Sequence, residues 1–291
     1  GQGGGGRGRL GMLGTVATVG AIAVSKTKWL LAGLKLAKLP TLISMLVSTG
    51  AYALVFGWPY AAGMVGLIAV HEAGHALVLR KEGIPYGPMV FMPFMGAVIE
   101  MRGRPRNAYV EAKVAYGGPL LGTAGAAAVA AAGHITNSQL LIALGDFGFM
   151  VNLFNLLPIG SMDGGRILGA VDRNFLLAGL GVGGYIAYAH TPMNPIFYLI
   201  LLSSGYNTYQ RFFGQSELPP SYYDMSNGQR MTIGTCYMLL VAGLLMAHSI
   251  NAKYKKSPAQ LRGEPEPEMF FEQYFESEEY LESDDDPWRR R

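Results

Sequence analysis

The sequence predicts an all-α polytopic membrane protein with about six transmembrane helices and a small membrane-embedded β-strand segment between the second and third spans. Two observations predict this fold. Half of the 291 residues are hydrophobic and only 15% are charged, and the mean hydropathy is +0.23, which is too apolar for an ordinary soluble domain. Several apolar runs also approach the ~20 residues that a helix needs to cross the hydrocarbon core.

The first two spans are expected at residues 42–58 and 60–79. The short connection between them carries no charge, which indicates a tight helical hairpin. Lys38 precedes the first span, and Arg80 and Lys81 follow the second. Because basic residues accumulate on the cytoplasmic side of membranes, we expect both basic ends on one face, in the inside orientation.

The stretch 83–101 separates the second span from the third. It contains Pro85, Pro88 and Pro93 among β-branched and bulky apolar residues. This composition excludes a spanning helix and favours extended strands, as in a hairpin inside the protein's own cleft. Backbone polar groups at that depth are tolerated only where protein or trapped water covers them.

Five further apolar runs are candidate helices. They are residues 114–132, which Gly117-Gly118-Pro119 opens, and residues 139–157, 176–189, 196–204 and 231–250. The run 196–204 is short for a span, and a polar segment, residues 205–230, separates it from the last run. The expected total is therefore about six.

Composition divides the chain into four parts. Residues 1–39 are a glycine-rich basic lead followed by an amphipathic, interfacial helix. Residues 40–170 form the core of the protein, and residues 171–256 contribute additional transmembrane helices. Residues 257–291 are an acidic tail that contains aromatic residues, which is either a solvated segment or a docking segment for a partner protein.

The net charge of +3 conceals a division between body and tail. Residues 264–286 contain eleven acidic residues and no basic ones, whereas residues 1–263 carry a net charge of +11. Basic loops on an apolar body suit the cytoplasmic, matrix or stromal face of a membrane. We therefore expect contact with a lipid bilayer, in a bacterial cytoplasmic membrane or an organelle (mitochondrial or plastid) membrane, and no nucleic-acid partner.

The candidate catalytic motif lies within the second span, at His71-Glu72-Ala73-Gly74-His75. Residues four apart share one face of a helix, so His71 and His75 can bind the same metal ion. Glu72 would then lie beside that ion, where it can take a proton from water. A stray histidine pair in a core helix is the alternative, and it is disfavoured because buried ionisable groups without a ligand are costly.

A catalytic zinc site usually has three protein ligands, so one ligand remains to be found. The single cysteine, Cys236, excludes a cysteine-built site, and the other histidines lie at predicted loops or span ends. Two carboxylates remain at membrane depth, Asp146 and Asp163. Asp163 follows a proline-broken helix end and precedes Gly164-Gly165, where a turn can bring its carboxylate to a neighbouring helix, and Asp146 lies within a span.

The order and spacing of these landmarks resemble the site-2 protease family of intramembrane zinc metalloproteases. The resemblance covers roughly residues 40–170, and Met162 stands where the family usually has leucine. The matching segments are His71-Glu72-Ala73-Gly74-His75, Gly117-Gly118-Pro119, Asn155-Leu156-Leu157-Pro158, Met162-Asp163-Gly164-Gly165 and a strand segment at residues 91–97.

The resemblance implies that His71, His75 and Asp163 bind zinc and that Glu72 is the general base. It also implies that Asn155 and Pro158 help to place the substrate strand. The expected substrate is a membrane protein with a transmembrane helix, cut within or near that helix. The core at residues 40–170 would then be an intramembrane metalloprotease core.

Two other functions fit parts of the sequence. A non-catalytic, protease-like scaffold subunit of a larger membrane complex would account for the aromatic acidic tail and the additional helices, but it has no need of Glu72. A metal transporter would spread polar residues along several spans, whereas here they gather at one depth. Metal-dependent proteolysis distinguishes the enzyme from both.

Overall fold

A computed structural model gives the fold of residues 39–189, 195–214 and 219–256. The lead expected before Leu39 and the acidic tail lie outside these residues, as does His190. In chain order the elements are α2 (Leu39–Phe56), α3 (Trp58–Lys81), β1 (Tyr86–Met92), β2 (Gly96–Met101), α4 (Ala108–Thr136), α5 (Gln139–Asn155), α6 (Asp163–Val171), α7 (Asn174–Ala189), α8 (Pro195–Phe213), the 3-10 turn η1 (Pro220–Tyr223) and α9 (Asn227–Ala252). The expected fold class, helices with one small sheet, is confirmed.

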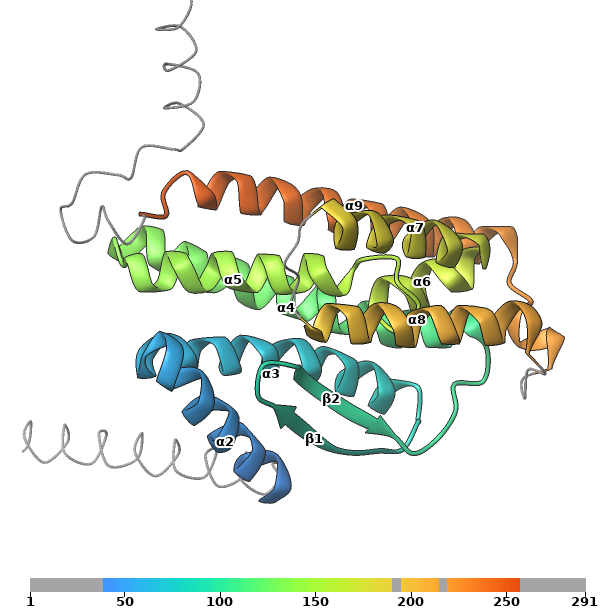
Figure 1. The fold of residues 1–291 in the computed structure, drawn as a ribbon, viewed down its shortest axis with the longest axis horizontal. Coiled ribbons are helices and arrows are strands. Elements are labelled where there is room, and N and C mark those ends of the chain that lie inside the picture. The colour runs from blue at the N-terminus through green and yellow to red at the C-terminus, as the bar shows by residue number, and fades with distance from the viewer. Residues whose placement is uncertain (1–38, 190–194, 215–218, 257–291) are drawn as a thin grey trace, which may run out of the picture.

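Helix α4 is a central element of the fold, since α3, α5, α6 and α9 all contact it (Figure 1). Its contact with α3 depends on glycine. A Cβ atom on Gly74 would lie 2.1 Å from the carbonyl oxygen of Gly117, so the two backbones touch. Gly125 approaches Val70 farther along the same seam, which makes the two helices antiparallel. Close approach through small residues is typical of helices packed in lipid.

The first two helices form the expected hairpin. Helix α2 ends at Phe56 and α3 begins at Trp58, with only Gly57 between them. Gly57 has φ +77°, a conformation that side-chain-bearing residues rarely adopt. The uncharged connection is therefore as tight as the sequence suggested.

The segment between α3 and α4 is the expected strand pair. Strands β1 and β2 pair antiparallel, with Val90 opposite Val98 and Met92 opposite Gly96. β1 packs against α2, where the Phe91 N–H donates to Ser44 Oγ at 3.1 Å, and β2 packs against α3. The hairpin therefore lies alongside the helix that carries the His-Glu-x-x-His motif (Figure 1).

The expected number of about six spans is not confirmed. Four helices of the described residues are long and apolar enough to cross a membrane, namely α2, α3, α4 and α9. Helices α5 and α7 are apolar but shorter, with 17 and 16 residues. A helix of 17 residues rises only about 25 Å, so α5 reaches across less than the ~30 Å hydrocarbon core.

Two expected helix boundaries are wrong. Helix α4 begins at Ala108, capped by the Asn107 side chain, so Gly117-Gly118-Pro119 lies inside the helix and does not open it. Its first turns are polar because they extend beyond the apolar run, and Lys113 there pairs with Glu82. Helix α8 continues to Phe213, well into the segment expected to be polar, because Thr208 and Arg211 face the protein interior.

Candidate metal centre

Helix α3 presents three of the candidate site residues from two successive turns. His71, Glu72 and His75 are buried, with exposed fractions of 4%, 7% and 9%. The seam with α4 makes room for His75. A Cβ atom on Gly118 would lie 2.2 Å from Nε2 of His75, so only glycine leaves space for this imidazole. The lack of side chains at Gly117 and Gly118 therefore leaves room for α3 and for His75.

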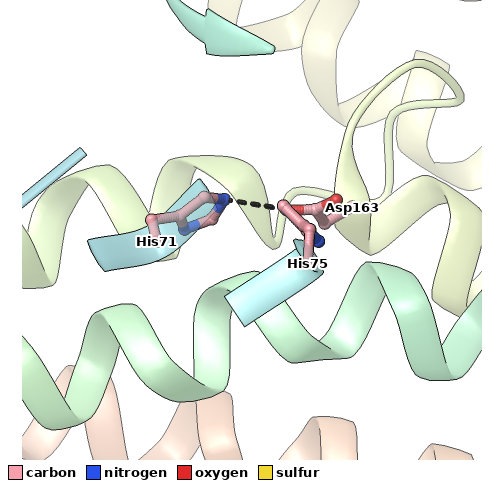
Figure 2. Close-up of side chains that lie close together, drawn as sticks. All are labelled: His71, His75 and Asp163. Atoms are coloured by element: carbon pink, nitrogen blue, oxygen red, sulfur yellow. Dashed lines mark hydrogen bonds and ion pairs between the residues drawn. The ribbon is translucent and has the colours of Figure 1, made fainter. Parts of the chain in front are cut away.

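The turn between α5 and α6 brings Asp163 to the same place. Asp163 is the first residue of α6 and is buried, and Figure 2 shows its carboxylate beside the two imidazole rings. The next two residues, Gly164 and Gly165, lie against the backbone of the loop that precedes α6, which leaves no space for side chains. A Cβ atom on either would lie 2.1 Å from a carbonyl oxygen, that of Leu156 or of Ile159.

The three candidate ligand atoms form a nearly equilateral triangle. Nε2 of His71 lies 3.2 Å from Nε2 of His75 and 3.2 Å from Oδ2 of Asp163. Nε2 of His75 lies 3.3 Å from the same oxygen. Tetrahedral ligands at zinc distances of about 2.0–2.1 Å would stand about 3.3–3.4 Å apart. The spacing and the donor set therefore fit a small tetrahedral divalent ion.

Both imidazoles are held by their other ring nitrogen. Nδ1 of His71 lies 2.9 Å from Oδ1 of Asn152 on α5, and Nδ1 of His75 lies 2.8 Å from the backbone oxygen of Val114 on α4. Each Nδ1 must carry a proton to make these bonds, which leaves Nε2 free to bind a metal. The contact of Asn152 with His71 was not predicted from the sequence, in which the position of Asn152 one helical turn before Asn155 is the only available signal.

A cavity opens onto the three candidate metal ligands. Its wall includes Glu72 and Asn155, so the proposed base and one proposed substrate-binding residue face the same space as the ligands. Strand β2 forms another side of it. The remaining lining residues are Leu79, Ala97, Val98, Ile99, Met101, Val114, Ser161, Met162 and Arg166.

Pro158, the other residue expected to place the substrate, is not in this wall. Its carbonyl oxygen lies against α7, where a Cβ atom on Gly179 would be 1.8 Å away. Pro158 therefore shapes the loop that carries Asp163, and its role in substrate binding stays a prediction.

Asp146, the other candidate ligand, is not brought to the histidines. Its Oδ1 lies 2.8 Å from Nδ1 of His248, and its Oδ2 pairs with Lys255. His134 bonds Asn251 at 3.1 Å and is also outside the cluster. Among the described residues, the group that could hold a metal ion is His71, His75 and Asp163.

The fold and the site define a class, a helical membrane protein with a buried group of two histidines and one aspartate that could hold a metal ion. No protein-family model matches the chain. "Putative zinc metalloprotease Rip3" of Mycobacterium tuberculosis is 31% identical over 143 residues, covering 45% of this chain and 36% of that protein. "Zinc metalloprotease MJ0392" of Methanocaldococcus jannaschii is 30% identical over 109 residues, covering 36% and 31%.

The chain thus matches about a third of the length of these curated relatives. Their names agree with the resemblance to the site-2 protease family that the motifs indicate, and that resemblance is confirmed for the part of the chain that aligns. The relatives also support a metalloprotease function, and the buried cluster supplies residues suited to the metal.

Proposed function

We propose that the protein is a zinc-dependent intramembrane protease that hydrolyses a peptide bond within or near a transmembrane segment of a membrane-protein substrate. The observation that supports this most directly is the triangle of His71, His75 and Asp163, with Glu72 in the wall of the same cavity. These groups are buried among apolar helices, which suits a substrate that arrives within the lipid.

The two imidazoles and the carboxylate would hold zinc. Bound there, zinc would polarise the scissile carbonyl group and lower the pKa of a water molecule. His71 and His75 keep their Nε2 atoms turned to the site because Asn152 and the Val114 carbonyl fix the opposite ring nitrogens. The protein therefore prepares the metal site before any substrate enters.

Glu72 carries the proton in this mechanism. Its carboxylate takes a proton from the water that attacks the peptide carbonyl carbon and passes it to the amine nitrogen as the C–N bond breaks. Glu72 is buried, which limits its contact with bulk water. Replacing it by glutamine removes the base without changing the shape of the side chain.

A transmembrane substrate must unwind locally, because the hydrogen bonds of a helix shield its peptide bonds. The unwound backbone needs new partners, since free amides in lipid cost several kcal/mol each. Strand β2 lines the cavity and can pair with an extended peptide, with Asn155 as a further hydrogen-bonding group. The inferred partners are therefore a membrane protein with a transmembrane helix and the bilayer itself. A further partner protein would bind through the acidic tail or belong with this chain to a larger membrane complex.

The test compares wild-type protein with Glu72→Gln in liposomes that contain a panel of single-span test proteins, with products identified by mass spectrometry. We expect about one zinc per chain in both proteins, and cleavage by the wild type alone. A chelator should abolish this cleavage and added zinc should restore it. Glu82→Gln, another glutamate substitution just beyond the end of α3 and outside the cavity, is the matched control and should cleave normally.

Cleavage by Glu72→Gln at an unchanged rate would remove Glu72 from the role of base. Zinc bound by a wild-type protein that cuts no test protein would favour the scaffold subunit. A wild-type protein that binds no zinc would contradict the metal site itself. The His71→Ala/His75→Ala variant serves as the zinc-free reference for this measurement.

A further inference from the structure

The metal ligand Asp163 is carried by an unusually small element. Helix α6 has nine residues, and Asp163 is its first. Helices this short are marginal by themselves, because nucleation is costly and few backbone hydrogen bonds repay it. The position of Asp163 therefore depends on whatever holds α6 in place.

The C-terminal end of α6 presents carbonyl groups that the helix itself cannot satisfy. The N–H of Asp172 donates to Leu168, which leaves the oxygens of Gly169, Ala170 and Val171. Unpaired carbonyls are expensive in an apolar surrounding. This end of the helix needs donors from elsewhere in the chain.

Two arginines supply these donors. Arg211 of α8 donates through Nη2 to the oxygen of Gly169. Arg230 of α9 donates through Nη1 to the oxygen of Val171 and reaches that of Ala170 at 3.5 Å. All three remaining carbonyls of α6 thus face a guanidinium group.

Both arginines are themselves fixed. Arg230 also donates to the backbone oxygen of Tyr223 at 3.2 Å and to that of Met225 at 3.4 Å. The Arg211 guanidinium lies 4.2 Å from the centre of the Tyr223 ring. Because positive charge at a helix C-terminus also interacts favourably with the helix dipole, the two guanidinium groups stabilise α6 and tie it to α8, α9 and the η1 turn.

We propose that Arg211 and Arg230 are positioning residues for the metal centre, which hold α6 so that Asp163 meets His71 and His75. Helices α8 and α9 then belong to the machinery of the metal site, although they lie beyond the core at residues 40–170. The inference rests on the proposed function, because it concerns the same metal site. A short helix moves as a rigid rod about 12 Å long between Asp163 and Val171, so loosening one end displaces the other.

The test measures zinc affinity in detergent by competition with a chromophoric chelator, for wild type, Arg230→Gln and Arg211→Gln/Arg230→Gln. We expect zinc binding to weaken by about 10–100-fold in the single variant, as for other residues that orient metal ligands, and further in the double variant. Arg230→Lys keeps the charge and one donor and should recover part of the affinity. Arg106→Gln, which removes an exposed arginine paired with Glu82, is the matched control and should bind zinc like the wild type.

Hydrogen exchange of the metal-free proteins identifies the mechanism. Amides of α6 should exchange faster in Arg230→Gln than in the wild type, while those of α3 and α4 stay unchanged. Wild-type zinc affinity in the folded double variant would overturn the proposal and leave the metal site intact. Unaltered α6 exchange in Arg230→Gln would overturn it too, and a wild type without zinc would overturn the proposed function together with this inference.

Discussion

The side-chain oxygen of Asn152 lies 2.9 Å from Nδ1 of His71, and the Asn152 amide nitrogen donates to the backbone oxygen of Gly148 at 2.7 Å. The second bond fixes which end of the amide faces the imidazole. Nδ1 of His71 therefore carries the proton, and Nε2 points toward Asp163. A residue of α5 thus sets the tautomer of a candidate metal ligand on α3.

Replacing Asn152 by leucine should weaken zinc binding by about 10–100-fold, because His71 loses the acceptor that fixes its ring. Competition with a chelator measures the change. Asn152→Asp keeps an acceptor at this position and should retain most of the affinity. Equal zinc binding in the leucine variant and the wild type would mean that the metal alone orients His71.

Gly118→Ala should displace His75 and strongly reduce zinc content. The new Cβ atom would lie 2.2 Å from Nε2 of His75, the ring nitrogen proposed to bind zinc. Elemental analysis of purified protein gives the zinc stoichiometry. The control is Gly66→Ala on α3, where nothing lies within 4 Å of the added atom and zinc should be retained. Full zinc content in Gly118→Ala would show that His75 is not a ligand.

Asp163→Asn should weaken zinc binding strongly, because it removes the charged ligand. The loss should exceed the about 10–100-fold effect of removing a residue that only orients a ligand. Asp146→Asn should bind zinc normally. It should instead lower the melting temperature slightly, since His248 and Lys255 lose the negative charge that faces them, and partly exposed ion pairs are worth at most about 1 kcal/mol. Zinc affinity measured for both variants identifies the third ligand. Normal zinc binding in Asp163→Asn and weak binding in Asp146→Asn would assign that role to Asp146.

The pair of Glu82 and Lys113 should make stability depend on pH. The hydrogen bond from Lys113 lowers the pKa of Glu82 below 4.5, with smaller contributions from Arg106 and Lys81. Because the pKa of Glu82 is lower in the folded state than in the unfolded state, its ionisation stabilises the protein at pH values above the unfolded-state pKa. This stabilisation is lost as the pH falls through the folded-state pKa. Glu82→Gln should therefore be less stable than the wild type at pH 7, by up to about 1 kcal/mol.

Thermal melting in detergent at several pH values measures this difference. The melting temperatures of wild type and Glu82→Gln should converge below pH 4.5 as Glu82 becomes protonated in both states of the wild type. A difference that persists unchanged at low pH would attribute the effect to packing and not to charge.

The local parts of the structure could be predicted because they depend on short-range patterns. The four-residue spacing of His71 and His75 places them on one helix face in any helix. Prolines between apolar β-branched residues exclude a helix in residues 83–101, and the β1–β2 hairpin lies there. The number of spans could not be predicted in the same way, because hydropathy does not distinguish a helix long enough to cross a membrane, such as α4, from a shorter apolar helix, such as α5.

By itself, the sequence determined that this is an apolar helical protein with a paired-histidine motif, and its resemblance to a known family pointed to Asp163. Only the tertiary structure decided which distant groups serve that motif. Asn152, Arg211 and Arg230 each contact a residue that lies 42 to 81 positions away in the sequence. The periodicity of a single helix cannot predict such long-range contacts. Asp146 and Asp163 are both buried aspartates within apolar sequence, and the packing of α5 against α9 and of α6 against α4 separates their roles.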